Sequence, residues 1–163
     1  EYQSIIGAGN GRAVRFEEKC VRASGRTAAG VRGMNVDGSE VVGIATDNEG
    51  QKILAISKYG YGKKTELEEY RMTSRGGKGV KTINISDKNG ELVAIKAVNG
   101  DEDALIMTND GIIIRISLET VATLGRSTIG VRLIKTQEDT YVSTVSLLEH
   151  QEDTEVIEKE GEE

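Results

Sequence analysis

The sequence has 163 residues, with 20 glycines, no proline, no tryptophan and one cysteine, and its formal net charge is −6. This length accommodates one domain or a few stacked repeats around a buried core. The single Cys20 excludes an internal disulfide and favours a reducing compartment, and no apolar run approaches the roughly 18 residues of a transmembrane helix. No signal-peptide pattern opens the chain, and its start within a strand pattern at Glu1 indicates a piece of a longer protein.

Three hairpins are predicted along the chain, each around a turn that contains glycine. The turns are Asn10-Gly11, Gly60 and Asn109-Asp110-Gly111, and alternating apolar segments flank them. The predicted hairpin strands are residues 4–8 and 12–16, 52–57 and 63–67, and 105–108 and 112–117. Further strands are predicted at 41–45, 92–98 and 141–148. No apolar period of 3.6 residues persists beyond a turn or two, and 63–71 is the segment most easily mistaken for a helix.

The sequence repeats itself with a period near 50 residues. Gly30-Val31-Arg32, Gly79-Val80-Lys81 and Gly130-Val131-Arg132 are the same triplet, 49 and 51 residues apart. Four short strands in each period predict an all-β fold of propeller-like, four-stranded antiparallel blades. We divide the body into repeat units at about 1–35, 36–84 and 85–135, with a closing strand at 136–148. The repeated glycines are expected to be turn positions with positive φ, and the triplet valines are expected in the core.

The acidic charge is concentrated at the end of the sequence. Residues 149–163 contain eight of the 27 acids and one of the 21 lysines and arginines, a net charge of −7, which leaves +1 for residues 1–148. A segment of this composition cannot bury enough apolar surface to fold alone. We therefore expect 149–163 to be a disordered acidic tail.

Cations recur in phase with the period. Three sets of equivalent positions, which we call columns, are cationic in all three repeats: Arg15, Lys64 and Arg115; Arg26, Arg75 and Arg126; and Arg32, Lys81 and Arg132. A fourth set is cationic at Arg22 and Arg71, but its third member is Ala122. Equal phase places side chains on the same face of every blade, so we expect a curved basic stripe that suits a polyanion. The turn from Arg75 to Gly79 would bring backbone N–H groups and cations to one anionic ligand.

The sequence contains no recognisable catalytic or cofactor site. Residues 7–11 are rich in glycine but lack the spacing of a dinucleotide-binding turn. Gly62-Lys63-Lys64-Thr65 imitates the end of a phosphate-binding loop, but Ser57 stands where its first glycine is required. One cysteine and one histidine, His150, supply neither a zinc cluster nor a nucleophile with its base. We expect no enzyme activity, cofactor or metal in this chain by itself.

Four segments carry a family resemblance. They are Tyr59-Gly60-Tyr61-Gly62-Lys63-Lys64-Thr65, Glu69-Tyr70-Arg71 through Gly79-Val80-Lys81, Gly111-Ile112-Ile113-Ile114-Arg115, and Gly125-Arg126 followed by Gly130-Val131-Arg132-Leu133-Ile134. Together they resemble the C-terminal domain of the DNA gyrase A protein, from the bacterial type IIA topoisomerases, over about residues 2–148. The resemblance implies a β-pinwheel, in which usually six propeller-like blades exchange strands with their neighbours. This chain is similar to about the last three blades.

The family's seven-residue box, Gln-Arg-Arg-Gly-Gly-Lys-Gly, belongs to its first blade. Here residues 73–79 match five of the seven positions in a later blade, so they resemble a degenerate copy. The true box would then precede residue 1. The corresponding C-terminal DNA-binding domain of topoisomerase IV is an alternative to the gyrase family.

The resemblance implies that the outer rim wraps and bends duplex DNA without sequence preference and so supports negative supercoiling by a gyrase holoenzyme. The implied partners are double-stranded DNA, the N-terminal region of the gyrase A protein, and the gyrase B protein, in the bacterial cytoplasm at the nucleoid. Catalytic residues, ATP and Mg²⁺ would belong to other parts of that holoenzyme. The expected DNA contacts are Arg15, Arg22, Arg26, Arg32, Lys63, Lys64, Arg71, Arg75, Lys78, Lys81, Arg115, Arg126 and Arg132.

Two further alternatives concern partners. A propeller of the protein-interaction class could use the same basic face to bind an acidic protein. The acidic tail could lie on the basic rim and compete with DNA, or it could serve only to keep the chain soluble.

Overall fold

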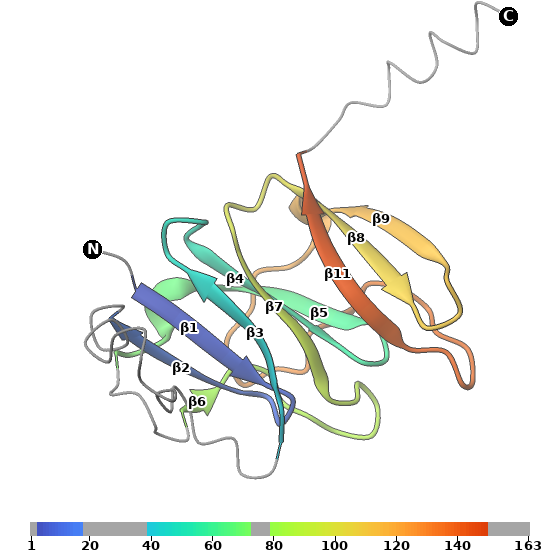
Figure 1. Ribbon diagram of the computed structural model, residues 1–163, viewed down its shortest axis with the longest axis horizontal. Helices are drawn as coiled ribbons and strands as arrows, with labels where there is room; N and C mark the ends of the chain where they lie inside the picture. The colour runs from blue at the N-terminus through green and yellow to red at the C-terminus, as the bar shows by residue number, and fades with distance from the viewer. Residues whose placement is uncertain (1–2, 18–38, 73–78, 150–163) are drawn as a thin grey trace, which may run out of the picture.

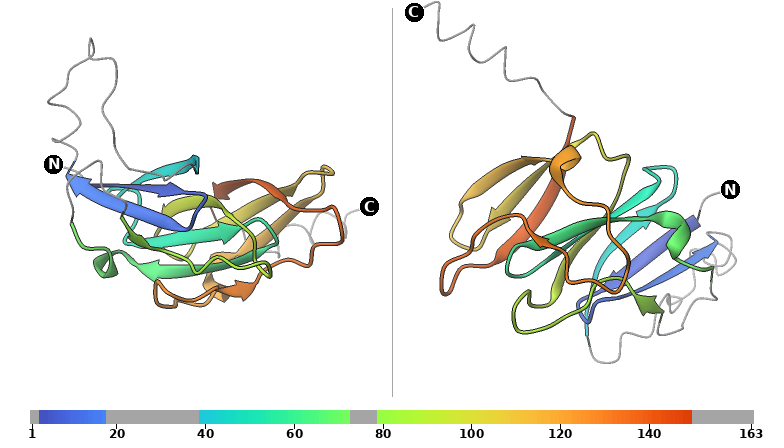
Figure 2. Two further views of the ribbon diagram at one scale, coloured as in Figure 1. Left: turned by 90° about the horizontal axis from the view of Figure 1, so that it is seen from below. Right: turned by 180° about the vertical axis from the view of Figure 1, so that it is seen from behind.

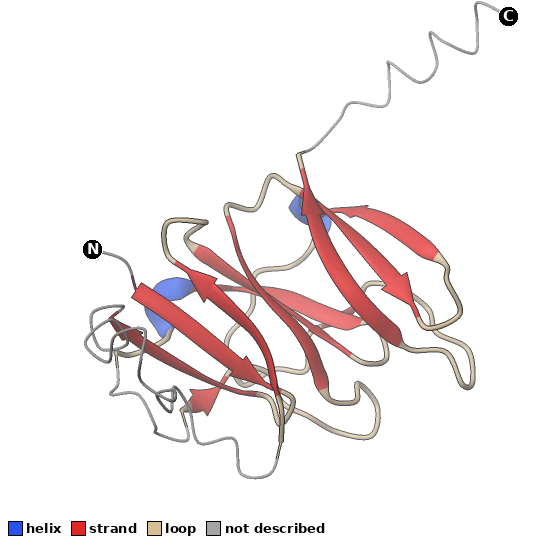
Figure 3. Ribbon diagram, viewed as in Figure 1, coloured by secondary structure: helices blue, strands red, loops and turns tan. Residues whose placement is uncertain are grey.

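The computed structural model describes residues 3–17, 39–72 and 79–149. These residues form eleven strands, two short 3-10 helices and no α-helix, which confirms the predicted all-β fold (Figure 3). The strands are β1 (Gln3–Ala8), β2 (Arg12–Glu17), β3 (Val41–Thr46), β4 (Lys52–Ser57), β5 (Tyr61–Glu66), β6 (Val80–Lys81), β7 (Leu92–Val98), β8 (Asp103–Thr108), β9 (Ile113–Ser117), β10 (Val131–Arg132) and β11 (Val142–Leu148). The 3-10 helices are η1 (Leu67–Glu69) and η2 (Leu118–Thr120).

The strands form three antiparallel sheets that lie in a row. The first has the order β3-β1-β2-β6, the middle one β10-β5-β4-β7 and the third β11-β8-β9. Figure 1 and the right-hand view of Figure 2 both show the first sheet at one end of the row and the third sheet at the other. Each sheet contains one hairpin, as the glycine turns predict; it is central in the first two sheets, and in the third sheet its strand β9 lies at the edge.

Neighbouring sheets exchange strands. β6 belongs in sequence to the second repeat but pairs with β2 of the first sheet, and β10 belongs to the third repeat but pairs with β5 of the middle sheet. Strand exchange of this kind distinguishes a pinwheel from a simple propeller, so the implied fold is confirmed. A repeating sequence does not show where one structural unit ends and the next begins. In the structure, each hairpin forms a sheet with the long strand that follows it in the sequence, so the sheets do not coincide with the units 1–35, 36–84 and 85–135.

The core lies between adjacent sheets. One cluster of buried side chains joins the first and middle sheets and includes Ile5, Ile53 and Ile95. At this junction a Cβ atom built on Gly7 or on Gly43 would lie 2.9 Å from Cγ2 of Ile95, so the two glycines let β7 approach the first sheet. The other large cluster joins the middle and third sheets in the same way. Each sheet therefore depends on its neighbour for its buried surface.

The helix-like segment 63–71 is a strand followed by a single turn. β5 ends at Glu66, and the N–H of Tyr70 then donates to the carbonyl of Leu67 at 3.0 Å to close η1. Leu67 and Tyr70 are buried in the junction between the first and middle sheets. Tertiary burial of these two side chains, rather than helix propensity, therefore determines the local structure.

The predictions for the repeated residues are confirmed for glycine and only partly for valine. Gly11, Gly60 and Gly111 have φ values of 84°, 86° and 88°. Val80 packs against the junction core, but Val131 is 41% exposed, so its predicted place in the core is wrong. Val131 lies in β10, at the outer edge of the middle sheet, where solvent reaches one face. Val31 and most of the acidic tail lie outside the described residues.

Candidate nucleic-acid interface

Arg15 does not point away from the protein but binds the next repeat. Its Nη1 donates to the carbonyl oxygens of Leu67 at 3.2 Å and Tyr70 at 2.8 Å, and its Nη2 donates to the side chain of Gln3. The side chain is half-buried between β2 and the turn around η1. Arg15 thus joins two sheets through charge-assisted hydrogen bonds.

Lys64, the equivalent residue of the second repeat, faces the next junction. It is 5% exposed, and its backbone N–H donates to Ala122 while its carbonyl accepts from Leu124. Burial lowers the pKa of its ammonium group, and the nearby charge of Lys52 adds to that shift. A buried cation cannot reach a phosphate outside the protein, so we do not retain Lys64 as a DNA contact.

Lys63 is fully buried and holds the segment that leads into β10. Its Nζ donates to the carbonyl oxygens of Gly125 at 2.6 Å, Arg126 at 2.9 Å and Thr128 at 3.0 Å, and to the hydroxyl of Thr128 at 3.0 Å. Burial lowers the pKa of Lys63 to about 8, against the opposing effect of Glu69. Its assignment as a DNA contact is also corrected, because its charge binds carbonyl oxygens inside the protein.

Arg115 completes this column in the third repeat, where no following repeat is present among the described residues. Its Nε lies 2.7 Å from Oδ2 of Asp103, and its Nη2 donates to the carbonyl of Glu149 at 3.2 Å. The side chain is 38% exposed. Arg15 and Lys64 are therefore junction residues, whereas Arg115 is partly exposed and pairs within its own sheet.

Exposed cations instead gather at the outer edges of the first two sheets. In the first sheet, Arg12 and Lys81 are paired residues of β2 and β6, and both are exposed. Nη1 of Arg12 donates to the carbonyl of Gly79 at 3.2 Å. Arg126, which precedes β10, donates from Nη1 to the carbonyl of Lys81 at 2.9 Å and so links this edge to the next repeat.

The middle sheet presents a similar arrangement around Tyr61. Arg132 of β10 is the pairing partner of Tyr61, donates to its hydroxyl at 3.1 Å and lies 5.4 Å from the ring centroid. Nζ of Lys88 lies 5.7 Å from the same centroid. Two cations thus share one buried aromatic ring and keep their charges in solvent.

We call Arg12, Lys81, Lys88 and Arg132 the outer-edge cations. None of them forms an ion pair with another described residue. The N–H of Asn84 donates to Thr128 at 3.0 Å, which places the segment after β6 beside the segment before β10. The two edges therefore adjoin, and their charges remain available to an external anion.

The remaining predicted contacts have varied positions. Arg71 is exposed just after η1. Five others lie outside the described residues, namely Arg22, Arg26, Arg32, Arg75 and Lys78. The sequence did not predict Arg12 or Lys88, because the equivalent positions in the other repeats are not cationic: Arg12 corresponds to Tyr61 and Ile112. Periodicity could not have identified these two cations; only their positions close to a glycine turn, Arg12 after Gly11 and Lys88 before Gly90, could have indicated them.

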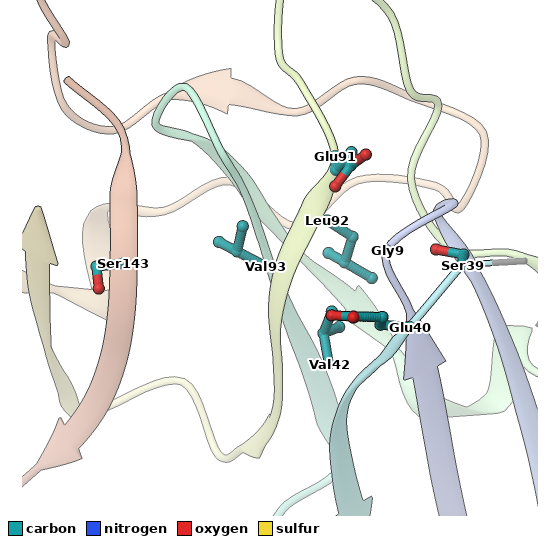
Figure 4. A pocket seen from close by; sticks show the side chains of 8 residues that line it. All are labelled: Gly9, Ser39, Glu40, Val42, Glu91, Leu92, Val93 and Ser143. Carbon is teal, nitrogen blue, oxygen red and sulfur yellow. The ribbon is translucent and has the colours of Figure 1, made fainter. Parts of the chain in front are cut away.

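Concave features of the described residues away from these cations are acidic. A cavity of about 470 Å³ lies between β3, β7 and β11, with Glu40, Glu91 and Ser143 among its lining residues (Figure 4). Its charged groups are carboxylates, so it repels rather than attracts an anion. In residues 3–17, 39–72 and 79–149, no three His, Cys, Asp or Glu side chains are grouped to hold a metal ion. No helix in the same ranges is long and apolar enough to cross a membrane.

The sequence matches the family described as DNA gyrase C-terminal domain, beta-propeller, over residues 5–46, 51–99 and 102–148. The DNA gyrase A protein of Ureaplasma parvum is 43% identical over 149 residues, which cover 91% of this chain and 18% of that protein. The DNA gyrase A protein of Staphylococcus aureus is 42% identical over 154 residues, which cover 93% of this chain and 17% of that protein. The chain thus spans less than a fifth of the length of these relatives.

Solved structures show the same fold. A DNA gyrase A C-terminal domain superposes with a TM-score of 0.83 at 25% identity and covers 91% of this chain, which spans 51% of that domain. A C-terminal domain of DNA topoisomerase IV superposes with a TM-score of 0.82 at 23% identity and covers 98% of this chain, which spans 50% of that domain. Each solved domain is therefore about twice as long as the matched part.

Proposed function

Because the chain belongs to the DNA gyrase C-terminal domain family, we propose that it binds duplex DNA along the outer edges of its sheets and bends it. The observation that supports this function is the exposure of the outer-edge cations on two adjoining edges, with no carboxylate of the described residues paired to them. Duplex DNA carries a negative charge about every 1.7 Å along its axis and suits such a surface.

The binding is directed at phosphates rather than bases. The cations lie at the ends of short edge strands, and no described helix or two-stranded ribbon projects that could enter a major groove. Lysine and arginine contacts to phosphates carry no sequence information, so affinity depends on salt and little on sequence. Smooth bending of 20–30 base pairs by 40–90° costs about 1–6 kcal/mol, which the summed phosphate contacts must offset.

The proposed role in the larger protein is to present DNA to a separate catalytic centre. Strand cleavage and ATP hydrolysis with Mg²⁺ would belong to the N-terminal region of the gyrase A protein and to the gyrase B protein. This chain would hold the wrapped segment of DNA, at the bacterial nucleoid. Supercoiling with a fixed sign would follow from the direction in which DNA passes around the edges.

A ligation experiment tests wrapping directly. Nicked circular DNA is sealed with and without saturating amounts of the chain, and the linking number is measured after the protein is removed. Wrapping shifts the linking-number distribution in one direction, and the shift increases with the amount of protein bound. An unshifted distribution at full occupancy would contradict wrapping, and binding of acidic proteins with no affinity for DNA would favour the interaction-propeller alternative.

A further inference from the structure

The segment between β6 and β7 connects the first sheet to the middle sheet, and we call its residues 82–91 the edge loop. At its start, the N–H of Thr82 donates to the carbonyl of Gly11, in the hairpin turn of the first sheet, at 2.8 Å. Near its end, the carbonyl of Asn89 accepts from the N–H of Tyr59, in the hairpin turn of the middle sheet, at 3.0 Å. Figure 1 shows the segment running from β6 to the start of β7. The edge loop therefore crosses the place where the two outer edges adjoin.

Asn89 of the edge loop is fully buried, although asparagine is usually an exposed residue. Its Oδ1 accepts from the backbone N–H of Ser86 at 2.8 Å and from the hydroxyl of Ser86 at 3.2 Å. Its Nδ2 donates to the carbonyl of Asn84 at 2.9 Å and to that of Ile129 at 3.5 Å. Because the donors lie on one side of the amide and the acceptors on the other, only one orientation of the side chain satisfies them.

These partners come from three separate parts of the candidate interface. Asn84 follows β6, the edge strand of the first sheet, and Ile129 precedes β10, the edge strand of the middle sheet. Ser86 opens the turn that carries Lys88, and its Oγ accepts from the N–H of Lys88 at 3.3 Å. One buried amide thus binds a segment beside each edge strand and the turn between them.

The turn that Asn89 closes also determines where the charge of Lys88 lies. Lys88 is the residue before Asn89, and its exposed side chain reaches the ring of Tyr61 in the middle sheet, with Nζ 5.7 Å from the centroid. Arg132 donates to the hydroxyl of the same tyrosine at 3.1 Å. The spacing of these two outer-edge cations therefore depends on the hydrogen bonds of Asn89.

Two other bonds link the edges, and neither is made by a buried side chain. The N–H of Asn84 donates to the carbonyl of Thr128 at 3.0 Å, and Nη1 of Arg126 donates to the carbonyl of Lys81 at 2.9 Å. The side chain of Arg126 is partly exposed, so water competes for its bonds. The bonds of Asn89 are closed off from water, which strengthens them and makes their loss costly.

A bent duplex resists its deformation, so a surface that bends DNA has to hold its phosphate contacts in fixed relative positions. We propose that Asn89 is a positioning residue of the DNA interface, which fixes the two outer edges and Lys88 relative to one another so that DNA bound to both edges is bent. This inference rests on the proposed function. It adds that bending depends on a buried side chain that contacts no DNA, whereas attraction of DNA depends on the exposed charges alone.

Two variants separate bending from binding. Asn89→Ala removes both the donor and the acceptor of the amide. Asn89→Ser is milder, because its hydroxyl can still accept from Ser86 but is too short to reach the carbonyl oxygens of Asn84 and Ile129. Neither variant changes a charge, so the outer-edge cations all remain. Circular dichroism and urea unfolding check that each variant is folded, and Asn89→Ser carries the test if Asn89→Ala is unfolded.

Two controls lie away from the outer edges. Asn109→Ala is matched in chemistry, because Asn109 donates to the carbonyl of Asp139 at 3.0 Å and accepts from the N–H of Tyr141 at 2.9 Å, which joins the third hairpin turn to the loop before β11. Ile106→Val is matched in burial, because Ile106 is fully buried between the middle and third sheets. A loss of wrapping caused by lower stability alone would appear in these controls as well.

Two quantities are measured for every protein. They are the linking-number shift per bound chain on nicked circular DNA and the slope of log affinity against log salt on a linear duplex. For both Asn89 variants we expect the linking-number shift to fall below about half of the wild-type value, since unconnected edges cannot hold a bend. We expect the slope to change by less than about 0.9, the value of one phosphate contact. The two controls should keep both quantities.

A wild-type linking-number shift in Asn89→Ala and Asn89→Ser would overturn this inference and leave the proposed function intact. A slope that falls together with the shift would also overturn it, because Asn89 would then support binding and not bending. An equal loss of the shift in the two controls would overturn it as well, since stability would be the cause. If the wild type itself produced no shift at full occupancy, the proposed function would fail and this inference with it.

Discussion

Lys63 is a cation that serves the fold. Its ammonium group is surrounded by four oxygen acceptors from the segment 125–128, and burial lowers its pKa to about 8. The equivalent residues in the other repeats are Val14 and Ile114. Lys63 thus occupies a position that is apolar in the other two repeats. The sequence could have indicated in this way that its side chain is buried.

Replacing Lys63 with methionine keeps the length of the side chain and removes its donors. The carbonyl oxygens of Gly125 and Arg126 then lose a buried partner, so we expect the free energy of unfolding to fall by about 1–3 kcal/mol. Urea denaturation measures this change, and Lys135→Met, at an exposed site, is the control. A loss no larger than that of the control would show that the lysine does not stabilise this segment.

The same group predicts a dependence of stability on pH. Its pKa is about 8 in the folded chain and near 10.5 in the unfolded chain, so between these values the unfolded state binds more protons. Stability of the wild type should therefore rise with pH relative to Lys63→Met, by up to about 1.4 kcal/mol per pH unit. Unfolding at pH 7.5 and 9.5 checks the sign.

The comparison stays below pH 10 for a second reason. Burial raises the pKa of Tyr70 to about 12, so its effect on stability has the opposite sign and begins near pH 10. Both proteins contain Tyr70, which further removes it from the difference. Parallel pH profiles for the wild type and Lys63→Met would contradict a lowered pKa at Lys63.

At the scale of strands, apolar alternation and glycine turns predicted the hairpins to within one or two residues. The exchange of β6 and β10 could not be derived in this way, because a Gly-Val-Arg strand can pair with its own hairpin or with the preceding one. The family resemblance implied it. Periodicity likewise predicted that cations share a face but not whether that face is the surface or a junction, and Arg15 shows that it can be a junction.

Two glycines with the same backbone conformation should differ in their tolerance of alanine. Gly60 and Gly111 have φ values of 86° and 88°, so alanine at either position costs about 1–2 kcal/mol. At Gly60 the added Cβ also meets the carbonyl oxygen of Ile134 at 2.7 Å, which adds about 1–3 kcal/mol. Urea unfolding of both variants measures the difference. Equal losses would show that β10 does not cover Gly60 in solution.

At the scale of the whole molecule, net charge is a poor guide to the partner. The chain carries −6, yet residues 149–163 account for −7, and the four outer-edge cations are exposed on adjoining sheets. Phosphate binding responds to this local distribution, because charges beyond about 10 Å are screened at 0.1 M salt. An acidic protein can therefore present a track for DNA.

We propose that the cations divide into junction residues, such as Arg15 and Lys63, and the outer-edge cations, and that only the outer-edge cations bind DNA. The measurement is the slope of log affinity against log salt for a duplex, compared between Lys81→Gln/Arg132→Gln and Lys58→Gln/Lys96→Gln. Both double variants remove two positive charges, but Lys58 lies over the ring of Tyr141, next to β11, and Lys96 lies on β7, at the edge of the middle sheet opposite β10. We predict that the first variant reduces the slope by about 1.8, or 0.9 for each lost phosphate contact, and that the second leaves it unchanged. Equal reductions in both variants would contradict the account, since DNA would then respond to total charge and not to the outer edges.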